Sequence, residues 1–248
     1  MNDIVTWLRQ RATAATARGF VVGLSGGLDS AVVARLCQLA IPGQVAGVIM
    51  PCRSDPNDEA DAALVADAFG LTTLHVDLNG AFETVLDSAS AALAGLPSEM
   101  RGATGEAAER IANGNIRARL RMATLYYVAN SLEYLVVGTG NRSELTIGYF
   151  TKHGDGGVDL LPIGHLLKNQ VRSVARELGV PQAIIDKAPA AGLWPGQTDE
   201  AEMGFSYADL ERYLTNGPEG VSPALALRLE RVIRSTEHKR TLPPTPEP

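Results

Sequence analysis

The sequence predicts an α/β fold: a doubly wound, mostly parallel five-stranded sheet with helices on both faces. Short apolar runs rich in β-branched residues alternate with longer helical patterns, which is typical of consecutive βαβ units. The runs are apolar over most of their length, as expected of parallel strands that helices cover on both faces. Four strands can be placed on this basis, at Phe20–Gly23, Val45–Met50, Thr72–Val76 and Tyr134–Val137.

Helical patterns fill the sequence around these strands. Asp55 and Pro56 suit a helix N-cap and the position after it, and Gly70 and Gly179 stand where helix C-caps are expected. The predicted helices are Asp3–Ala17, Ser30–Leu39, Pro56–Phe69, Ala81–Leu93, Glu106–Ser131, Lys168–Leu178, Tyr207–Leu214 and Pro223–Ser235. Right-handed crossovers would bring the carboxyl ends of all strands to one edge of the sheet, where open α/β sheets bind ligands.

The length suits a single domain over residues 1–240. Two segments rich in Gly and Pro, Leu96–Gly105 and Pro189–Gly204, are expected to be mobile, because long loops of this kind are usually functional or disordered. The last eight residues, Thr241–Pro248, have no periodicity and are expected to be disordered.

The composition excludes several classes of protein. The net charge is −6 and no basic tract offsets it, which argues against nucleic-acid binding. No N-terminal apolar segment or long apolar run is present, so neither secretion nor membrane insertion is expected. The two cysteines, Cys37 and Cys52, cannot form a disulfide framework, which favours a cytoplasmic protein.

The segment Gly23–Ser30 (GLSGGLDS) is predicted to bind phosphate. It joins an apolar strand to a helix, and the N–H groups and dipole at a helix N-terminus favour anions. Gly26 and Gly27 allow the backbone to approach phosphate oxygens closely. Asp29 stands where the Walker-type loop has its lysine. Because a carboxylate repels phosphate unless a cation lies between them, this aspartate predicts Mg²⁺.

A second polar block follows the strand Tyr134–Val137. Glu144, Lys152, Asp159 and Lys168 are spread among glycines there, and carboxylates with ammonium groups are what a site for phosphate and metal needs. A solvated charged loop is the alternative for this block. Both blocks would lie at the same edge of the sheet.

Taken together, these motifs resemble a known family of enzymes. SGGLDS is similar to the pyrophosphate-binding loop of the N-type ATP pyrophosphatases, and the strings NGNIRARLRM, GTGNRSELTIGYFTKHGDGGVDLLPIG, GLWPGQTDE and EHKR resemble ammonia-dependent NAD synthetases. The resemblance extends from the first helix to Arg240. It implies an adenine nucleotide alpha-hydrolase-like fold and a ligase that forms a C–N bond.

In that family, the nicotinate carboxylate of deamido-NAD attacks the α-phosphate of ATP, which gives an acyl-adenylate and pyrophosphate. Ammonia then attacks the acyl carbon and releases NAD and AMP. The resemblance implies an ATP site at Gly23, Leu24, Ser25, Gly26, Gly27, Leu28, Asp29, Ser30, Thr139 and Lys168, with Asp29 and Lys168 catalytic. It further implies Mg²⁺ at Asp29 and Glu144, and deamido-NAD at Arg119, Lys152, Asp159, His238 and Lys239.

The resemblance has one departure and leaves alternatives open. The family usually has a threonine where this chain has Ala190, so no ATP contact is carried over to that residue. The length leaves no room for a glutaminase domain, so free ammonia, or a partner that delivers it, is expected as the nitrogen source. The apolar helix around Tyr126–Val128 suits the family's homodimer. The alternatives are another N-type ATP pyrophosphatase with a different substrate, or a non-catalytic nucleotide-binding module.

Overall fold

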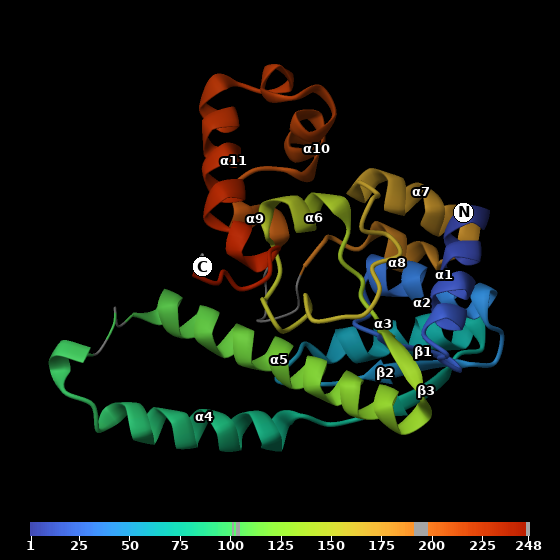
Figure 1. The fold of residues 1–248 in the computed structure, drawn as a ribbon, viewed down its shortest axis with the longest axis horizontal. Coiled ribbons are helices and arrows are strands. Elements are labelled where there is room, and N and C mark those ends of the chain that lie inside the picture. Colours follow the sequence, from blue (N-terminus) through green and yellow to red (C-terminus); the bar gives the residue numbers. More distant parts are fainter. Residues whose placement is uncertain (101, 103–104, 191–197, 247–248) are drawn as a thin grey trace.

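A parallel sheet lies at the centre of the molecule. The structure is a computed structural model that describes residues 1–100, 102, 105–190 and 198–246. In this part of the chain the sheet has four strands, in the order β3-β2-β1-β4 (Figure 1). They are β1 (Gly19–Gly23), β2 (Val45–Ile49), β3 (Thr72–His75) and β4 (Tyr134–Val137). All three strand pairs are parallel, which confirms the four strands placed from the sequence.

The predicted count of five strands is wrong for the described residues. Beyond β4, Leu160 forms only an isolated parallel bridge with Val137. The Gly138 N–H donates to the Leu160 carbonyl over 2.8 Å, and no further rung follows in the ladder. Pro162 comes two residues later, and a proline has no N–H with which to continue a strand.

Eleven α-helices surround the sheet in the described residues. They are α1 (Asn2–Ala14), α2 (Leu28–Ala40), α3 (Pro56–Phe69), α4 (Asn79–Ala94), α5 (Glu106–Leu132), α6 (Arg142–Ile147), α7 (Lys168–Leu178), α8 (Gln182–Asp186), α9 (Asp199–Met203), α10 (Tyr207–Asn216) and α11 (Pro223–Ser235). Short 3₁₀ turns follow at η1 (Ser98–Met100), η2 (Pro218–Gly220) and η3 (Glu237–Lys239).

All eight predicted helices are confirmed. Asp55 caps α3 by accepting a hydrogen bond from the Asn57 N–H, and Gly70 and Gly179 end α3 and α7 with φ of 59° and 73°. The prediction missed α6, α8 and α9, because five or six residues are too few for a helical period to stand out. Helix α9 lies within the predicted mobile segment 189–204, whose residues 191–197 are outside the described part, as are residues 101, 103 and 104 of the other such segment.

The sheet separates two hydrophobic cores, which confirms the doubly wound arrangement. Phe20 and Val22 of β1 point to one face, where they join side chains of α1, α2, α3, α7 and α8. Val21 points to the other face, where it packs with Phe82 of α4 and Ala129 of α5. A third cluster forms between α6, α9, α10 and α11, beside the sheet (Figure 1). Among the described helices, none has the length and apolar character needed to cross a bilayer.

Strand β3 departs from the predicted burial. All four of its residues are exposed, including Leu74, although helices were expected to cover both faces of every strand. The strand lies at an edge of the sheet.

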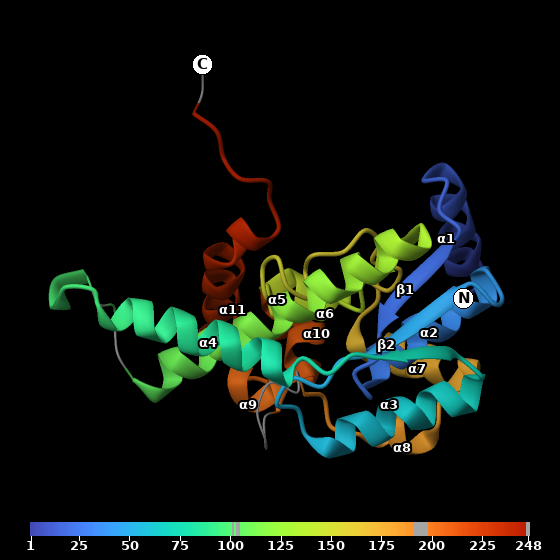
Figure 2. The same ribbon diagram turned by 90° about the horizontal axis from the view of Figure 1, so that it is seen from below.

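Helices α4 and α5 run side by side and project beyond the sheet as a long arm (Figures 1 and 2). A large part of this arm therefore lacks cover from the rest of the chain.

The C-terminal segment leaves the body of the molecule after η3. Residues 241–246 form no helix or strand and all are exposed (Figure 2). Residues 247 and 248, the end of the predicted disordered tail, lie outside the described residues.

Candidate active site

The candidate site lies where the chain reverses its direction across the sheet. The connections from β1 to β2 and from β2 to β3 step one way, and the chain then returns to place β4 on the other side of β1. The loops that follow β1 and β4 therefore diverge at the carboxyl edge of the sheet. Such a switch point is where open α/β sheets bind ligands.

The glycine loop joins β1 to α2. Gly26 has a φ of 72°, a left-handed conformation that favours glycine. The Ser25 hydroxyl accepts a hydrogen bond from the Gly27 N–H at 3.2 Å and lies 3.1 Å from the Ser30 hydroxyl. Ser30 also donates to the Gly27 carbonyl at 2.9 Å. These contacts hold the loop at the N-terminus of α2, where free N–H groups and the helix dipole favour an anion.

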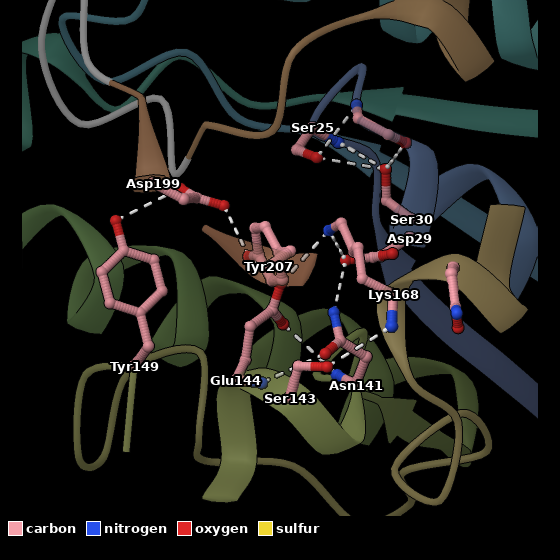
Figure 3. A network of polar contacts seen from close by, with 12 residues as sticks. Ser25, Asp29, Ser30, Asn141, Ser143, Glu144, Tyr149, Lys168, Asp199 and Tyr207 are labelled. Atoms are coloured by element: carbon pink, nitrogen blue, oxygen red, sulfur yellow. Dashed lines mark hydrogen bonds and ion pairs between the residues drawn. The ribbon is translucent and has the colours of Figure 1, made fainter. Parts of the chain in front are cut away.

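A buried lysine joins the two halves of the site (Figure 3). Lys168 begins α7, and its ammonium group lies 2.6 Å from Asp29 Oδ2 on α2 and 3.2 Å from Glu144 Oε1 on α6. Only 6% of the Lys168 side chain is exposed. Asn141 donates to Asp29 Oδ2 at 3.2 Å and forms a capping box with Glu144, which fixes the start of α6.

Burial and charge act against each other at this ion cluster. Burial raises the pKa of the Glu144 carboxyl to about 7, although Lys168 favours its charged form. Burial lowers the pKa of the Lys168 ammonium, but the attraction of Asp29 and Glu144 is stronger and leaves that pKa above its usual range. The lysine therefore stays charged, and it stabilises two carboxylates that would otherwise repel each other.

The two carboxylates fit a divalent cation that also binds phosphate. Asp29 Oδ1 is buried and has no hydrogen-bond partner, which leaves one carboxylate oxygen free to act as a ligand. No group of three or more His, Cys, Asp or Glu able to hold a metal occurs among the described residues. Mg²⁺ commonly uses only one or two carboxylates and takes its other ligands from phosphates and water. Asp29 and Glu144 match that pattern.

A second layer of polar side chains supports the carboxylates (Figure 3). The Tyr207 hydroxyl donates to Asp199 Oδ2 at 2.8 Å and lies 3.1 Å from Glu144 Oε1. The Tyr149 hydroxyl donates to Glu202 at 2.7 Å and lies 3.2 Å from Asp199 Oδ1. Asp199 and Tyr207 were not predicted as site residues. The sequence signal available for Asp199 was the string GQTDE, which carried the resemblance but no role for a single residue.

These groups surround one cavity of about 480 Å³. Its lining contains most of the predicted ATP site, namely Gly23, Leu24, Ser25, Gly27, Leu28, Asp29, Ser30, Thr139 and Lys168. Glu144, Ala190 and Lys239 also line it. Residues from distant parts of the sequence thus meet around a space large enough for a nucleotide.

The predicted deamido-NAD residues divide into three groups. Arg119 donates to the Lys152 carbonyl at 3.3 Å, and Lys152 in turn donates to the His238 carbonyl. Lys239 donates to the carbonyls of Gly148 and Phe150 and is the one residue of this set in the cavity lining. Asp159 forms the third group, and its side chain contacts α5 and β4.

The contacts of Asp159 are with α5 and β4. Its carboxylate accepts hydrogen bonds from the Tyr126 hydroxyl at 3.0 Å and from the Val136 N–H at 2.8 Å. The role of the five residues in substrate binding stays a prediction.

Comparison with known proteins identifies the family. A family model described as NAD synthase matches residues 1–243. The chain belongs to the NAD synthase family. An NH(3)-dependent NAD(+) synthetase from Carboxydothermus hydrogenoformans is 50% identical, over 99% of this chain and 96% of that protein. Another, from Alkaliphilus oremlandii, is 45% identical, over 100% of this chain and 96% of that protein.

Solved structures agree with the NAD synthase fold. The structure of an NMN synthetase from Francisella tularensis matches with a TM-score of 0.87 and 36% identity, over 99% of this chain and 96% of that one. An NH3-dependent NAD synthetase from Campylobacter jejuni matches with a TM-score of 0.78 and 26% identity, over 99% and 97% of the two chains. The fold class predicted from the sequence is thereby confirmed, apart from the strand count.

Proposed function

We propose that this member of the NAD synthase family makes NAD from deamido-NAD, ATP and ammonia. The nicotinate carboxylate oxygen attacks the α-phosphorus of ATP and pyrophosphate leaves. Ammonia then attacks the acyl carbon of the adenylate, AMP leaves, and the nitrogen loses a proton. The observation that carries the proposal is the Asp29–Lys168–Glu144 cluster beside the glycine loop, in a chain of this family.

The glycine loop and Lys168 are proposed to bind the triphosphate. The loop offers backbone N–H groups at the start of α2. Lys168 offers a positively charged ammonium group, whose pKa lies above its usual range. Thr139 lies in the same cavity lining and offers a hydroxyl. A buried cation placed where negative charge develops stabilises the transition state strongly, because little water screens it.

Asp29 and Glu144 are proposed to hold Mg²⁺. When bound, Mg²⁺ supplies charge neutralisation for the triphosphate as the carboxylate of the other substrate approaches. Asp29 Oδ1 is the best candidate ligand atom, because it is buried and makes no hydrogen bond. Tyr207 and Asn141 orient the two carboxylates through their contacts with Glu144 and Asp29.

Arg119, Lys152, Asp159, His238 and Lys239 are proposed to bind deamido-NAD. The contacts between Arg119, Lys152 and His238 link α5, the loop after α6 and η3. The Asp159 carboxylate contacts Tyr126 of α5, the residue before the exposed Tyr127. That position suits a substrate that extends from the cavity toward a subunit interface.

A homodimer is proposed, formed through the α4–α5 arm. Tyr127 of α5 is 74% exposed and Leu93 of α4 is 60% exposed, and both belong to the arm that the rest of the chain leaves largely uncovered (Figure 1). Apolar surface left uncovered by its own chain marks an interaction site when it is extensive. A second copy would bury these side chains.

A cytoplasmic location is also proposed, because Cys37 and Cys52 are both buried and both free thiols.

The proposal is tested by incubating the protein with ATP, Mg²⁺, ammonium and deamido-NAD and measuring NAD, AMP and pyrophosphate. We expect the three products in equal amounts. A parallel reaction with nicotinate mononucleotide is included because one structural neighbour is an NMN synthetase. Turnover of the mononucleotide alone, or cleavage of ATP to ADP, would contradict the proposal.

Asp29→Asn is the matched variant for the same assay. We expect kcat to fall by at least about a hundredfold, because one proposed carboxylate ligand and one of the two acidic partners of Lys168 are lost. The far-ultraviolet circular dichroism spectrum should stay unchanged. Full activity of this variant would remove Asp29 from the proposed metal site.

A further inference from the structure

A second lysine lies beside the glycine loop and has no part in the mechanism above. The Lys187 ammonium group is 2.9 Å from Asp58 Oδ1 and 2.6 Å from Asp61 Oδ2. The three side chains are between 23% and 30% exposed, so the cluster is partly screened from water. Lys187 follows α8, whereas both aspartates belong to the first turns of α3.

This cluster is packed directly against the glycine loop. A Cβ atom added at Gly26 would lie 2.5 Å from the Asp58 carbonyl oxygen and 2.8 Å from Asp61 Cβ. Asp58 and Lys187 also line the same cavity as Ser25, Gly27 and Lys168. Asp58 therefore lines the cavity of the proposed triphosphate, and Asp61 lies against the glycine loop beside it.

Two bare carboxylates at this position would repel a triphosphate. Charges of like sign a few ångströms apart, and only partly exposed to water, oppose each other strongly. Lys187 supplies one positive charge to the pair, and its hydrogen bonds with both aspartates outweigh burial and keep its pKa above the usual range. The cluster with Lys187 carries one negative charge, and without it two.

We propose that Lys187 is a positioning residue for ATP: it neutralises part of the charge of Asp58 and Asp61 so that the triphosphate can approach the glycine loop. The inference rests on the proposed ATP site. Attachment of the chain after α8 is not enough to explain the ion pairs of Lys187 with Asp58 and Asp61, because that segment has a second contact. The Asp199 N–H donates to the Pro189 carbonyl at 3.1 Å, so Lys187 is not the sole attachment of residues 188–190.

The first test is steady-state kinetics of Lys187→Met with ATP and deamido-NAD. We expect the KM for ATP to rise by about tenfold or more, which corresponds to ~1.4 kcal/mol. The KM for deamido-NAD should change by less than about twofold, since the cluster lies at the phosphate side of the cavity. Added KCl should reduce the ratio of the two KM values for ATP, variant over wild type, because salt screens the repulsion.

The second test is rescue by removing the repelling charges. In a background of Lys187→Met, the changes Asp58→Asn and Asp61→Asn should return the KM for ATP to within about threefold of wild type, which is ~0.7 kcal/mol. Arg18→Met is the control, because Arg18 is also a cation paired with an acid, Glu133, but its side chain is 65% exposed and outside the cavity lining. It should leave both KM values unchanged.

Two outcomes would overturn the inference. One is an unchanged KM for ATP in Lys187→Met. The other is a raised KM for ATP that neither salt nor the triple variant restores, in a protein whose circular dichroism spectrum and melting temperature stay close to wild type. That result would indicate a direct contact between Lys187 and ATP instead of charge neutralisation. The failure of the proposed function would look different, because wild-type protein would then form no NAD.

Discussion

At the scale of single residues, the central feature of the site is Lys168, which forms ion pairs with two acids. Its ammonium group is closer to Asp29 than to Glu144, at 2.6 Å against 3.2 Å. Glu144 also faces the Tyr207 hydroxyl and the Asn141 N–H, yet burial dominates and its pKa rises to about 7. In the absence of metal, this carboxyl group therefore takes up a proton more readily than it would in water.

The stability of the metal-free protein should depend on pH through Glu144. Its pKa is about 7 in the folded protein and 4.5 as the ordinary value. Between these values the folded state binds the proton more tightly than the unfolded state. The contribution of Glu144 is thus fully present below about pH 4.5, and the free energy of unfolding falls as the pH rises to about 7.

Urea unfolding in the presence of a chelator, at pH 5 and at pH 7, measures this effect. Glu144→Gln is the matched variant because it keeps the shape of the side chain and cannot titrate. We expect wild type to lose more stability than the variant between the two pH values. The same difference between wild type and variant at both pH values would show that Glu144 does not titrate in this range.

At the scale of elements, the contact between the glycine loop and α3 depends on the lack of a side chain at Gly26. Gly26→Ala should destabilise the protein by roughly 1–3 kcal/mol, since the residue combines a φ of 72° with a Cβ clash against Asp58 and Asp61. The KM for ATP should rise as well. Thermal unfolding and kinetics measure the two effects.

Gly43→Ala is the control for the backbone effect alone. Gly43 has a similar φ of 76°, but nothing lies within 4 Å of an added Cβ. It should cost only about 1 kcal/mol and leave ATP kinetics unchanged. Equal destabilisation by the two changes would mean that the loop moves freely away from α3.

Elements differ in how far the sequence predicts them. In α5 and α11 apolar residues recur at helical spacing over many residues, and α3 has Asp55, Pro56 and Gly70 at its ends. Local sequence alone therefore predicts these three helices. Helices α6 and α9 were missed, and they hold Glu144 and Asp199 in the site. Each is a single short helix stabilised by caps and by packing against distant residues, which no local period reveals.

At the scale of the whole molecule, the site depends on pairs that are far apart in sequence. Lys168 and Asp29 are separated by 139 positions, and they meet because α2 and α7 begin at the same edge of the sheet. The predicted parallel strands and right-handed crossovers are enough to bring the two loops to one edge of the sheet. The contacts of Tyr207 with Asp199 and of Asp159 with Tyr126 depend on side-chain packing, which the sequence pattern does not specify.

We expect the whole molecule to form a dimer with a second copy through the α4–α5 arm. Tyr127→Glu places a charge on the most exposed aromatic side chain of α5, which is 74% exposed. Since an interface centred on an aromatic residue loses at least ~2 kcal/mol when that residue is removed, we expect the dissociation constant of the dimer to rise about thirtyfold or more. Light scattering across a dilution series measures the change.

Leu227→Glu is the control for this experiment. Leu227 lies on α11 and is 65% exposed, so the substitution adds the same charge to an equally open apolar position away from the arm. We expect its dimer to be unchanged, and its melting temperature to match that of wild type. Because Asp159 contacts Tyr126, the residue before Tyr127, loss of the dimer should also raise the KM for deamido-NAD. A wild-type monomer at micromolar concentration, or equal weakening by both variants, would contradict an interface on the arm.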